Sequence, residues 1–106
     1  PTMNVSSDDD GYLISIETPG MKRDDIGVEL KGDRLIIRGE KREESEDKDR
    51  YFYRIERSYG AFQRVLSLPD DADADSLNAK LENGVLQIKL RRSESASDSS
   101  RVISVD

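Results

Sequence analysis

The stretch that decides the fold runs from residue 77 to residue 90: Leu77-Asn78-Ala79-Lys80-Leu81-Glu82-Asn83-Gly84-Val85-Leu86-Gln87-Ile88-Lys89-Leu90. Apolar residues occupy every second position on both sides of Asn83-Gly84, which is the pattern of strands buried on one face. An Asn-Gly pair between two alternating runs is the strongest short-range indicator of a type I′ hairpin. The stretch therefore predicts two antiparallel strands joined by a two-residue turn.

The same alternation recurs on both sides of this hairpin. It is found in residues 12–17, 26–31 and 62–68, while residues 34–38 form a β-branched run that we expect to be covered on both faces. Residues 3–7 are expected to add a short edge strand. Pro19-Gly20 suits a type II turn, and Lys31-Gly32-Asp33 predicts a second tight hairpin connection. Several short strands without a long helical period predict an all-β, antiparallel β-sandwich.

The composition favours a folded domain and excludes several classes of protein. Leu, Ile, Val and Phe number 25 of 106 residues and cluster in short runs, unlike the residues of a disordered chain. The net charge of −6 and the lack of a basic stripe argue against a nucleic-acid partner. No apolar stretch is long enough to span a membrane. The chain has no Cys, which fits a reducing compartment, and we expect it to be cytoplasmic.

The sequence offers little for catalysis, so we expect no enzyme, no cofactor and no small-molecule substrate. It contains neither His nor Cys, and no Gly-rich phosphate loop precedes a helix. Asp71, Asp73 and Asp75, with Glu82, have the spacing of a calcium-binding EF-hand loop. Ser76 stands where such a loop needs Gly, and no helical pattern flanks it. We therefore interpret the segment as a solvated acidic turn without a metal.

Two segments break the strand pattern. Residues 40–50 are almost entirely charged, and we expect a solvated loop or a short exposed helix there. They lead into Tyr51, Phe52 and Tyr53, which either cap the local core or belong to a strand projected onto another subunit. Residues 93–100 are rich in Ser and acidic residues and are expected to form a flexible linker. The chain thus divides into a domain of residues 1–92 and an extension of residues 93–106.

Arg64 places a charge in the apolar register of its strand. One interpretation is a side chain that reaches solvent from a strand edge. The other is a partly buried guanidinium that pairs with a carboxylate, which can belong to another subunit.

Several of these motifs together resemble the α-crystallin domain of small heat-shock proteins of the bacterial and plant type. Residues 79–86 match the family's A-x-x-x-N-G-V-L motif at every specified position. Pro19-Gly20-Met21, the stretches 35–40 and 56–62, and Leu68-Pro69 are also similar to the family. Ile103-Ser104-Val105 resembles its C-terminal I-x-I/V motif. The chain departs from the family at Ser67, where many relatives have Arg, and the resemblance implies that an N-terminal arm is missing.

The resemblance implies an immunoglobulin-like sandwich that dimerises by exchanging a strand of about residues 51–57, carried in a long loop. Dimer contacts are then expected at Tyr51, Phe52, Tyr53, Ile55 and Arg64. Homodimers would assemble into larger homo-oligomers. The implied function is that of an ATP-independent chaperone that binds unfolding client proteins and prevents their aggregation. Two alternatives remain open at this point, a p23/CS-like co-chaperone and an immunoglobulin-like binding module.

The terminal motif is expected to act as a detachable plug. In an extended segment Ile103 and Val105 lie on one face, about 6–7 Å apart, and Ser104 faces away. Residues 93–101 span at most roughly 30 Å, which allows docking on a neighbour or on the same domain. The receptors that we expect are apolar side chains of two strands, namely Val28, Leu30, Ala79 and Leu81.

Overall fold

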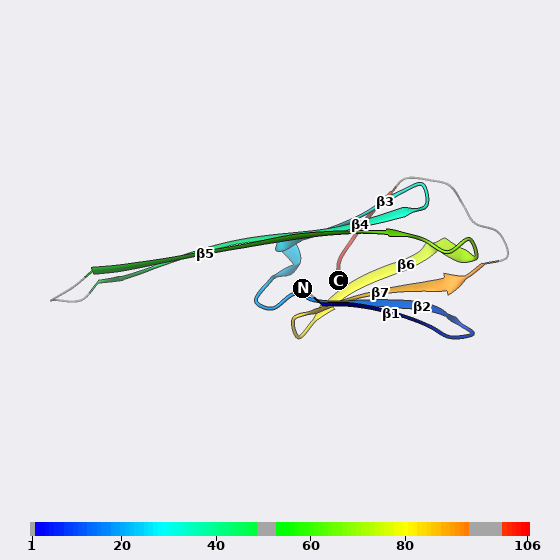
Figure 1. Cartoon of the computed structure of the whole chain (residues 1–106), viewed down its shortest axis with the longest axis horizontal. Coiled ribbons are helices and arrows are strands. Elements are labelled where there is room, and N and C mark those ends of the chain that lie inside the picture. Colours follow the sequence, from blue (N-terminus) through cyan, green and yellow to red (C-terminus); the bar gives the residue numbers. More distant parts are fainter. Residues whose placement is uncertain (1, 49–52, 94–100) are drawn as a thin grey trace.

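The chain forms two facing β-sheets, from which a long two-stranded arm projects (Figure 1). The computed structural model describes residues 2–48, 53–93 and 101–106, with the backbone alone for 42–48, 53–59, 101 and 102. Its elements are β1 (Met3–Ser7), β2 (Gly11–Glu17), the 3-10 turn η1 (Arg23–Asp25), β3 (Ile26–Lys31), β4 (Arg34–Lys48), β5 (Tyr53–Ser67), β6 (Ala72–Glu82), β7 (Val85–Arg92) and β8 (Arg101–Ile103).

One sheet has the strand order β1-β2-β7-β6 and the other has the order β5-β4-β3-β8. Neighbouring strands within each sheet run antiparallel, so the predicted all-β antiparallel sandwich is confirmed. The short edge strand expected at residues 3–7 is also present, as β1.

The core lies between the sheets and consists of the alternate apolar residues that the sequence pattern marks. Ile16 on β2 and Leu86 and Ile88 on β7 are fully buried from one side. Leu30 on β3 and Leu35 and Ile37 on β4 are fully buried from the other. Burial of such side chains contributes about 1.5–3 kcal/mol each, which is why the period-2 pattern fixes the register of every strand.

Two tight turns sit against each other at one end of the sandwich. Asn83 and Gly84 both have positive φ, 53° and 76°, as a type I′ hairpin requires. Gly20 also has positive φ, and the Met21 N–H donates to the Thr18 carbonyl at 3.1 Å, closing the predicted Pro19-Gly20 turn. The buried Thr18 joins the turns, because its N–H and its hydroxyl both donate to the Gly84 carbonyl, at 2.7 and 3.1 Å.

Two expectations were wrong. Residues 34–38 are covered on one face only: Ile36 is half-buried on the outer face, and Val65, its partner on β5, is 51% exposed. The sandwich has two layers, and no third layer within the described chain lies over that face. Residues 40–48 form neither loop nor helix, since they continue β4 in register with β5. The backbone pairing of the two strands continues without a break from Lys41 opposite Gly60 to Lys48 opposite Tyr53.

Candidate functional site

The four residues expected to form a docking groove come from two strands that belong to different sheets. Val28 and Leu30 lie on β3, and Ala79 and Leu81 lie on β6, the last strand of the facing sheet. Val28, Leu30 and Ala79 are buried and Leu81 is half-buried. We call this set the groove. It lies along one edge of the sandwich, between β3 of one sheet and β6 of the other.

Residues 101–106, which we call the tail, occupy this groove in the same chain. In β8 the tail adds to β3 as an antiparallel strand, with Ile103 opposite Val28 and Arg101 opposite Leu30. It then crosses to the other sheet, where Val105 pairs with Ala79 (Figure 1). The Asp106 N–H donates to the Ala79 carbonyl at 2.9 Å, and the Leu81 N–H donates to the Asp106 carbonyl at 2.7 Å.

The side chains of the tail alternate as an extended segment requires. Ile103 is buried, Ser104 is exposed, and Val105 packs against the core cluster as a half-buried residue. Backbone pairing to both sheets combined with two apolar anchors is the geometry of peptide recognition by strand addition. What the groove binds here is therefore an extended segment with apolar residues two positions apart.

The second feature is the arm, which we define as residues 41–48 of β4 and 53–60 of β5. Its strands stay paired from Lys41 opposite Gly60 to Lys48 opposite Tyr53, and they project well past the sandwich (Figure 1). The longest dimension of the molecule is accordingly 67 Å, against 24 and 19 Å for the others. Strand-exchange residues were expected in a loop, whereas Tyr53 and Ile55 belong to the continuous strand β5. Tyr51 and Phe52 lie outside the described residues.

Arg64 lies on β5 opposite Ile37, on the inward face between Phe62 and Leu66. It is half-buried, and its Nη1 donates to the Gln63 carbonyl at 2.9 Å. β5 is the outermost strand of its sheet, so Arg64 reaches the sheet edge at the base of the arm. The structure of one chain therefore places Arg64 close to the arm, and away from the tail and groove.

A third constellation, which the sequence pattern did not reveal, closes the opposite end of the sandwich. Tyr12, Asp71 and Arg92 form a group that we call the clasp. The Tyr12 hydroxyl donates to Asp71 Oδ1, and Arg92 Nη1 donates to Asp71 Oδ2 at 2.6 Å and to the Tyr12 hydroxyl at 2.7 Å. The guanidinium also lies 4.6 Å from the Tyr12 ring centroid and bonds the Asp8 carbonyl through Nε and Nη2. No sequence spacing connects these three positions, so only the fold reveals them.

The hydrogen bonds of the clasp shift the pKa values of Asp71 and Tyr12. The pKa of Asp71 is lowered, chiefly because Tyr12 and then Arg92 donate hydrogen bonds to its carboxylate. The pKa of Tyr12 is raised, because its hydroxyl must keep its proton to donate to Asp71. Both carboxylate oxygens of Asp71 thus accept hydrogen bonds within the clasp. Within the described residues, no group of three acidic side chains is arranged to hold a metal ion.

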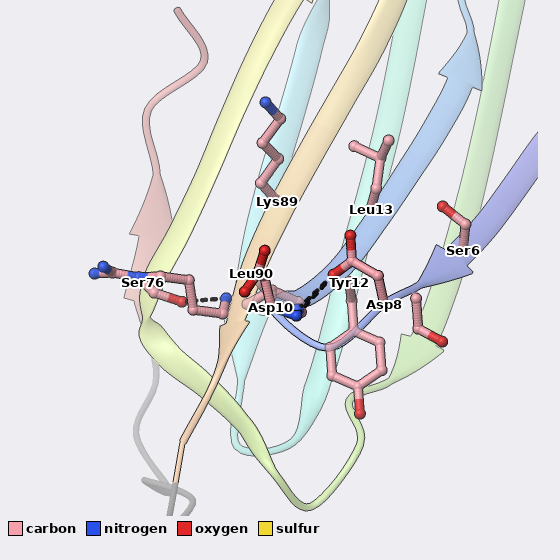
Figure 2. Close-up of a pocket in the computed structure, with 11 residues that line it drawn as sticks. Ser6, Asp8, Asp10, Tyr12, Leu13, Ser76, Lys89 and Leu90 are labelled. Atoms are coloured by element: carbon pink, nitrogen blue, oxygen red, sulfur yellow. Dashed lines mark hydrogen bonds between the residues drawn. The ribbon is translucent and has the colours of Figure 1, made fainter.

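Next to the clasp, a shallow hollow of about 350 Å³ opens on the outer face of β1, β2 and β7. Figure 2 shows Ser6, Leu13 and Lys89 around it, with Asp8 accepting hydrogen bonds from the backbone at the β1–β2 turn. Gly11 begins β2 there because a side chain at this position would clash with the Leu90 carbonyl of β7. Both polar and apolar side chains line the hollow, and we assign no chemistry to it.

Comparison with known proteins supplies the family. Residues 4–106 match the model of the Hsp20/alpha crystallin family, nearly the whole chain. The chain belongs to the Hsp20/alpha crystallin family. Its relatives are small heat-shock proteins, and membership of this family supports a chaperone role. No helix in the described part of the chain is long and apolar enough to cross a membrane.

Individual members of the family are similar over most of the chain. Small heat shock protein C2 of Rickettsia felis is 39% identical over 89% of this chain, which spans 61% of that protein. The chain spans only 43% of the 22.7 kDa class IV heat shock protein of Pisum sativum, at 42% identity over 78% of this chain. Among solved structures, a small heat-shock protein from Xylella fastidiosa has a TM-score of 0.71 at 33% identity, covering 93% of this chain and 91% of that one.

Proposed function

We propose that this chain acts as an ATP-independent holdase, which binds partly unfolded proteins and keeps them from aggregating. The observation that carries the proposal is the tail in the groove. The groove accepts an extended segment through backbone hydrogen bonds and two apolar anchors, Ile103 and Val105. An unfolding protein exposes segments of this kind, and capture of them removes the species that aggregates. The activity needs neither a nucleotide nor a catalytic residue.

Docking of the tail is expected to be reversible, so that the groove becomes available to clients. Burial of Ile103 and Val105 contributes about 1.5–3 kcal/mol for each side chain. Ordering the backbone costs about 1–2 kcal/mol for each residue of the tail. Over six residues the ordering cost is as large as this gain or larger, and the backbone hydrogen bonds of the tail offset the remainder. A single docked tail is therefore marginal and exchanges. Many tails in one assembly hold collectively, because later contacts form at high effective concentration.

The proposed partners are other copies of the chain as well as clients. The arm supports dimerisation, because an isolated two-stranded ribbon is only marginally stable in water and gains from a second subunit. The contacts that we propose there are Tyr51, Phe52, Tyr53, Ile55 and Arg64. Tails that dock into neighbouring grooves would then join dimers into larger assemblies. The cytosol is the compartment that we propose, since a chain without Cys needs no oxidising environment.

Suppression of aggregation tests the function directly. Citrate synthase is heated with increasing amounts of the chain, without nucleotide, and its aggregation is followed by light scattering. A holdase lowers the scattering in proportion to the chain added, and the client is recovered in a complex with it. Scattering equal to that with an inert protein such as albumin would overturn the proposal.

A double substitution tests the role of the tail in assembly. We expect Ile103→Gly with Val105→Gly to leave the dimer folded and to abolish larger assemblies, because both apolar anchors are lost. Light scattering over a concentration series gives the masses. Ser104→Gly is the matched control, since it changes the exposed residue between the anchors and should preserve the wild-type mass. Identical masses for the double variant and the wild type would contradict docking between subunits.

A further inference from the structure

The clasp lies at the point where the chain leaves the sandwich for the tail. Arg92 is the last residue of β7, and its side chain binds Asp71, the Tyr12 hydroxyl and the Asp8 carbonyl. The backbone is held at the same point, because the Ser93 N–H donates to the Asp71 carbonyl at 2.6 Å. Hydrogen bonds to Asp8, Tyr12 and Asp71 thus fix the end of β7.

The other end of the connection is fixed by the docked tail. Arg101 pairs with Leu30 of β3, eight residues after Ser93. Eight residues reach at most about 26–29 Å, so the position of Ser93 limits which grooves the tail can enter. The effective concentration of a tethered group is highest when the tether matches the span, and it falls as the tether lengthens.

We propose that Tyr12, Asp71 and Arg92 are positioning residues that fix the origin of the tail, and so direct Ile103 and Val105 into the groove of their own chain. Opening the clasp releases the end of β7, lengthens the tether and lowers the occupancy of that groove by its own tail. The groove then becomes more available to a second copy of the chain. This inference rests on the groove of the proposed function, and it adds the control of whether the tail docks within or between chains.

Competition with a free tail measures the occupancy of the groove. A fluorescent peptide of residues 101–106 is titrated with the full chain, and its apparent affinity scales with the fraction of grooves that are free. We expect Arg92→Met to bind the peptide about two- to five-fold more tightly than the wild type. Arg91→Met is the matched control, because Arg91 is the exposed neighbour whose backbone N–H, rather than its side chain, bonds Ser76. It should bind the peptide as the wild type does.

The same substitution in a chain without tail anchors distinguishes a positioning role of the clasp from a general loss of structure. In a chain that carries Ile103→Gly and Val105→Gly the groove is already empty, so Arg92→Met should leave its peptide affinity unchanged. A persistent effect there would overturn the proposal, as would equal affinities for Arg92→Met and the wild type. If Arg92→Met fails to fold, Tyr12→Phe replaces it, because it removes only the hydroxyl and should shift affinity in the same direction.

The failures of the two proposals are distinguishable. If the emptied groove binds no peptide, groove docking itself is refuted and the positioning role falls with it. If the emptied groove binds the peptide but the clasp variants match the wild type, only the positioning role is overturned. The citrate synthase assay is independent of both results.

Discussion

The hairpin β6–β7 and the hairpin β4–β5 have the same antiparallel pairing, but different parts of the molecule hold them. β7 buries Leu86, Ile88 and Leu90 along its whole inward face, and a two-residue turn joins it to β6. In β4–β5 the side chains of Leu35, Ile37 and Phe62 are buried in the half next to the sandwich, and the arm extends beyond that half (Figure 1). A hairpin inside the sandwich is thus stabilised by its own chain, whereas we propose that the arm is stabilised by a second subunit.

The largest expected effect falls on the inner hairpin. Ile88→Ala removes a fully buried side chain and should lower the free energy of unfolding by about 2–5 kcal/mol. Urea denaturation followed by circular dichroism measures this change. Lys89→Ala is the matched control on the exposed face of the same strand and should change stability by less than about 0.5 kcal/mol. Equal effects of the two variants would show that the core does not hold this hairpin.

The arm should respond in the opposite way. Replacing Tyr51, Phe52 and Tyr53 by Ser should leave the unfolding free energy of the sandwich unchanged and raise the dimer dissociation constant at least about 30-fold. Truncation of one aromatic anchor at an interface typically costs about 2 kcal/mol, which corresponds to that factor. Analytical ultracentrifugation measures the dissociation constant. A loss of thermal stability at constant subunit mass would mean that the aromatics cap the local core.

The difference between the hairpins also explains what could be predicted from the sequence. Alternation around Asn83-Gly84 specifies β6–β7 locally, because burial and turn geometry both lie within fourteen residues. Residues 40–48 carry no apolar alternation, and their strand structure depends on pairing with β5, so composition alone suggested a loop or helix. The apolar neighbours of Ile36 predict a run covered on both faces, and no local signal shows that the described part of the chain puts no third layer over its outer face.

The candidate site likewise has one part that the sequence predicts and one part that it does not. The apolar positions of the groove follow from periodicity, and the structure sets Val28 opposite Ile103 and Ala79 opposite Val105. The clasp could not be predicted, because its residues are separated by 59 and 21 positions and their types occur throughout the chain. Only the pairing of β2, β7 and β6 in one sheet brings them together.

Arg64 at the base of the arm should have an intermediate effect. Arg64→Gly should weaken dimerisation about ten-fold, or about 1.4 kcal/mol, since a half-buried guanidinium contributes less than the about 3–5 kcal/mol of a fully buried pair. Gln63→Gly is the control, because it places the same flexible residue on the exposed face of β5. Both variants should lose about 0.5–1 kcal/mol of stability from Gly in a strand. Equal dimer affinities for the two would favour a side chain that simply reaches solvent.

The smallest expected effect is the change with pH in the contribution of the clasp to the free energy of unfolding. The lowered pKa of Asp71 means that its contribution to stability is complete above the ordinary value of about 4 and is lost as the pH falls through the lower folded value. The raised pKa of Tyr12 gives the opposite sign: that contribution is complete below about pH 10 and is lost as the pH rises through the higher folded value. The difference in unfolding free energy between the wild type and Arg92→Met should therefore stay constant from about pH 5 to 9 and narrow at acidic pH, where Asp71 gains a proton and Arg92 loses its anionic partner. At alkaline pH the loss is common to both chains, because it comes from the hydrogen bond of Tyr12 to Asp71 and not from Arg92. Urea denaturation at a series of pH values measures it, with Arg91→Met as the variant whose difference stays flat throughout. A difference that changes between about pH 6 and 8 would show that some other group controls this end of the molecule.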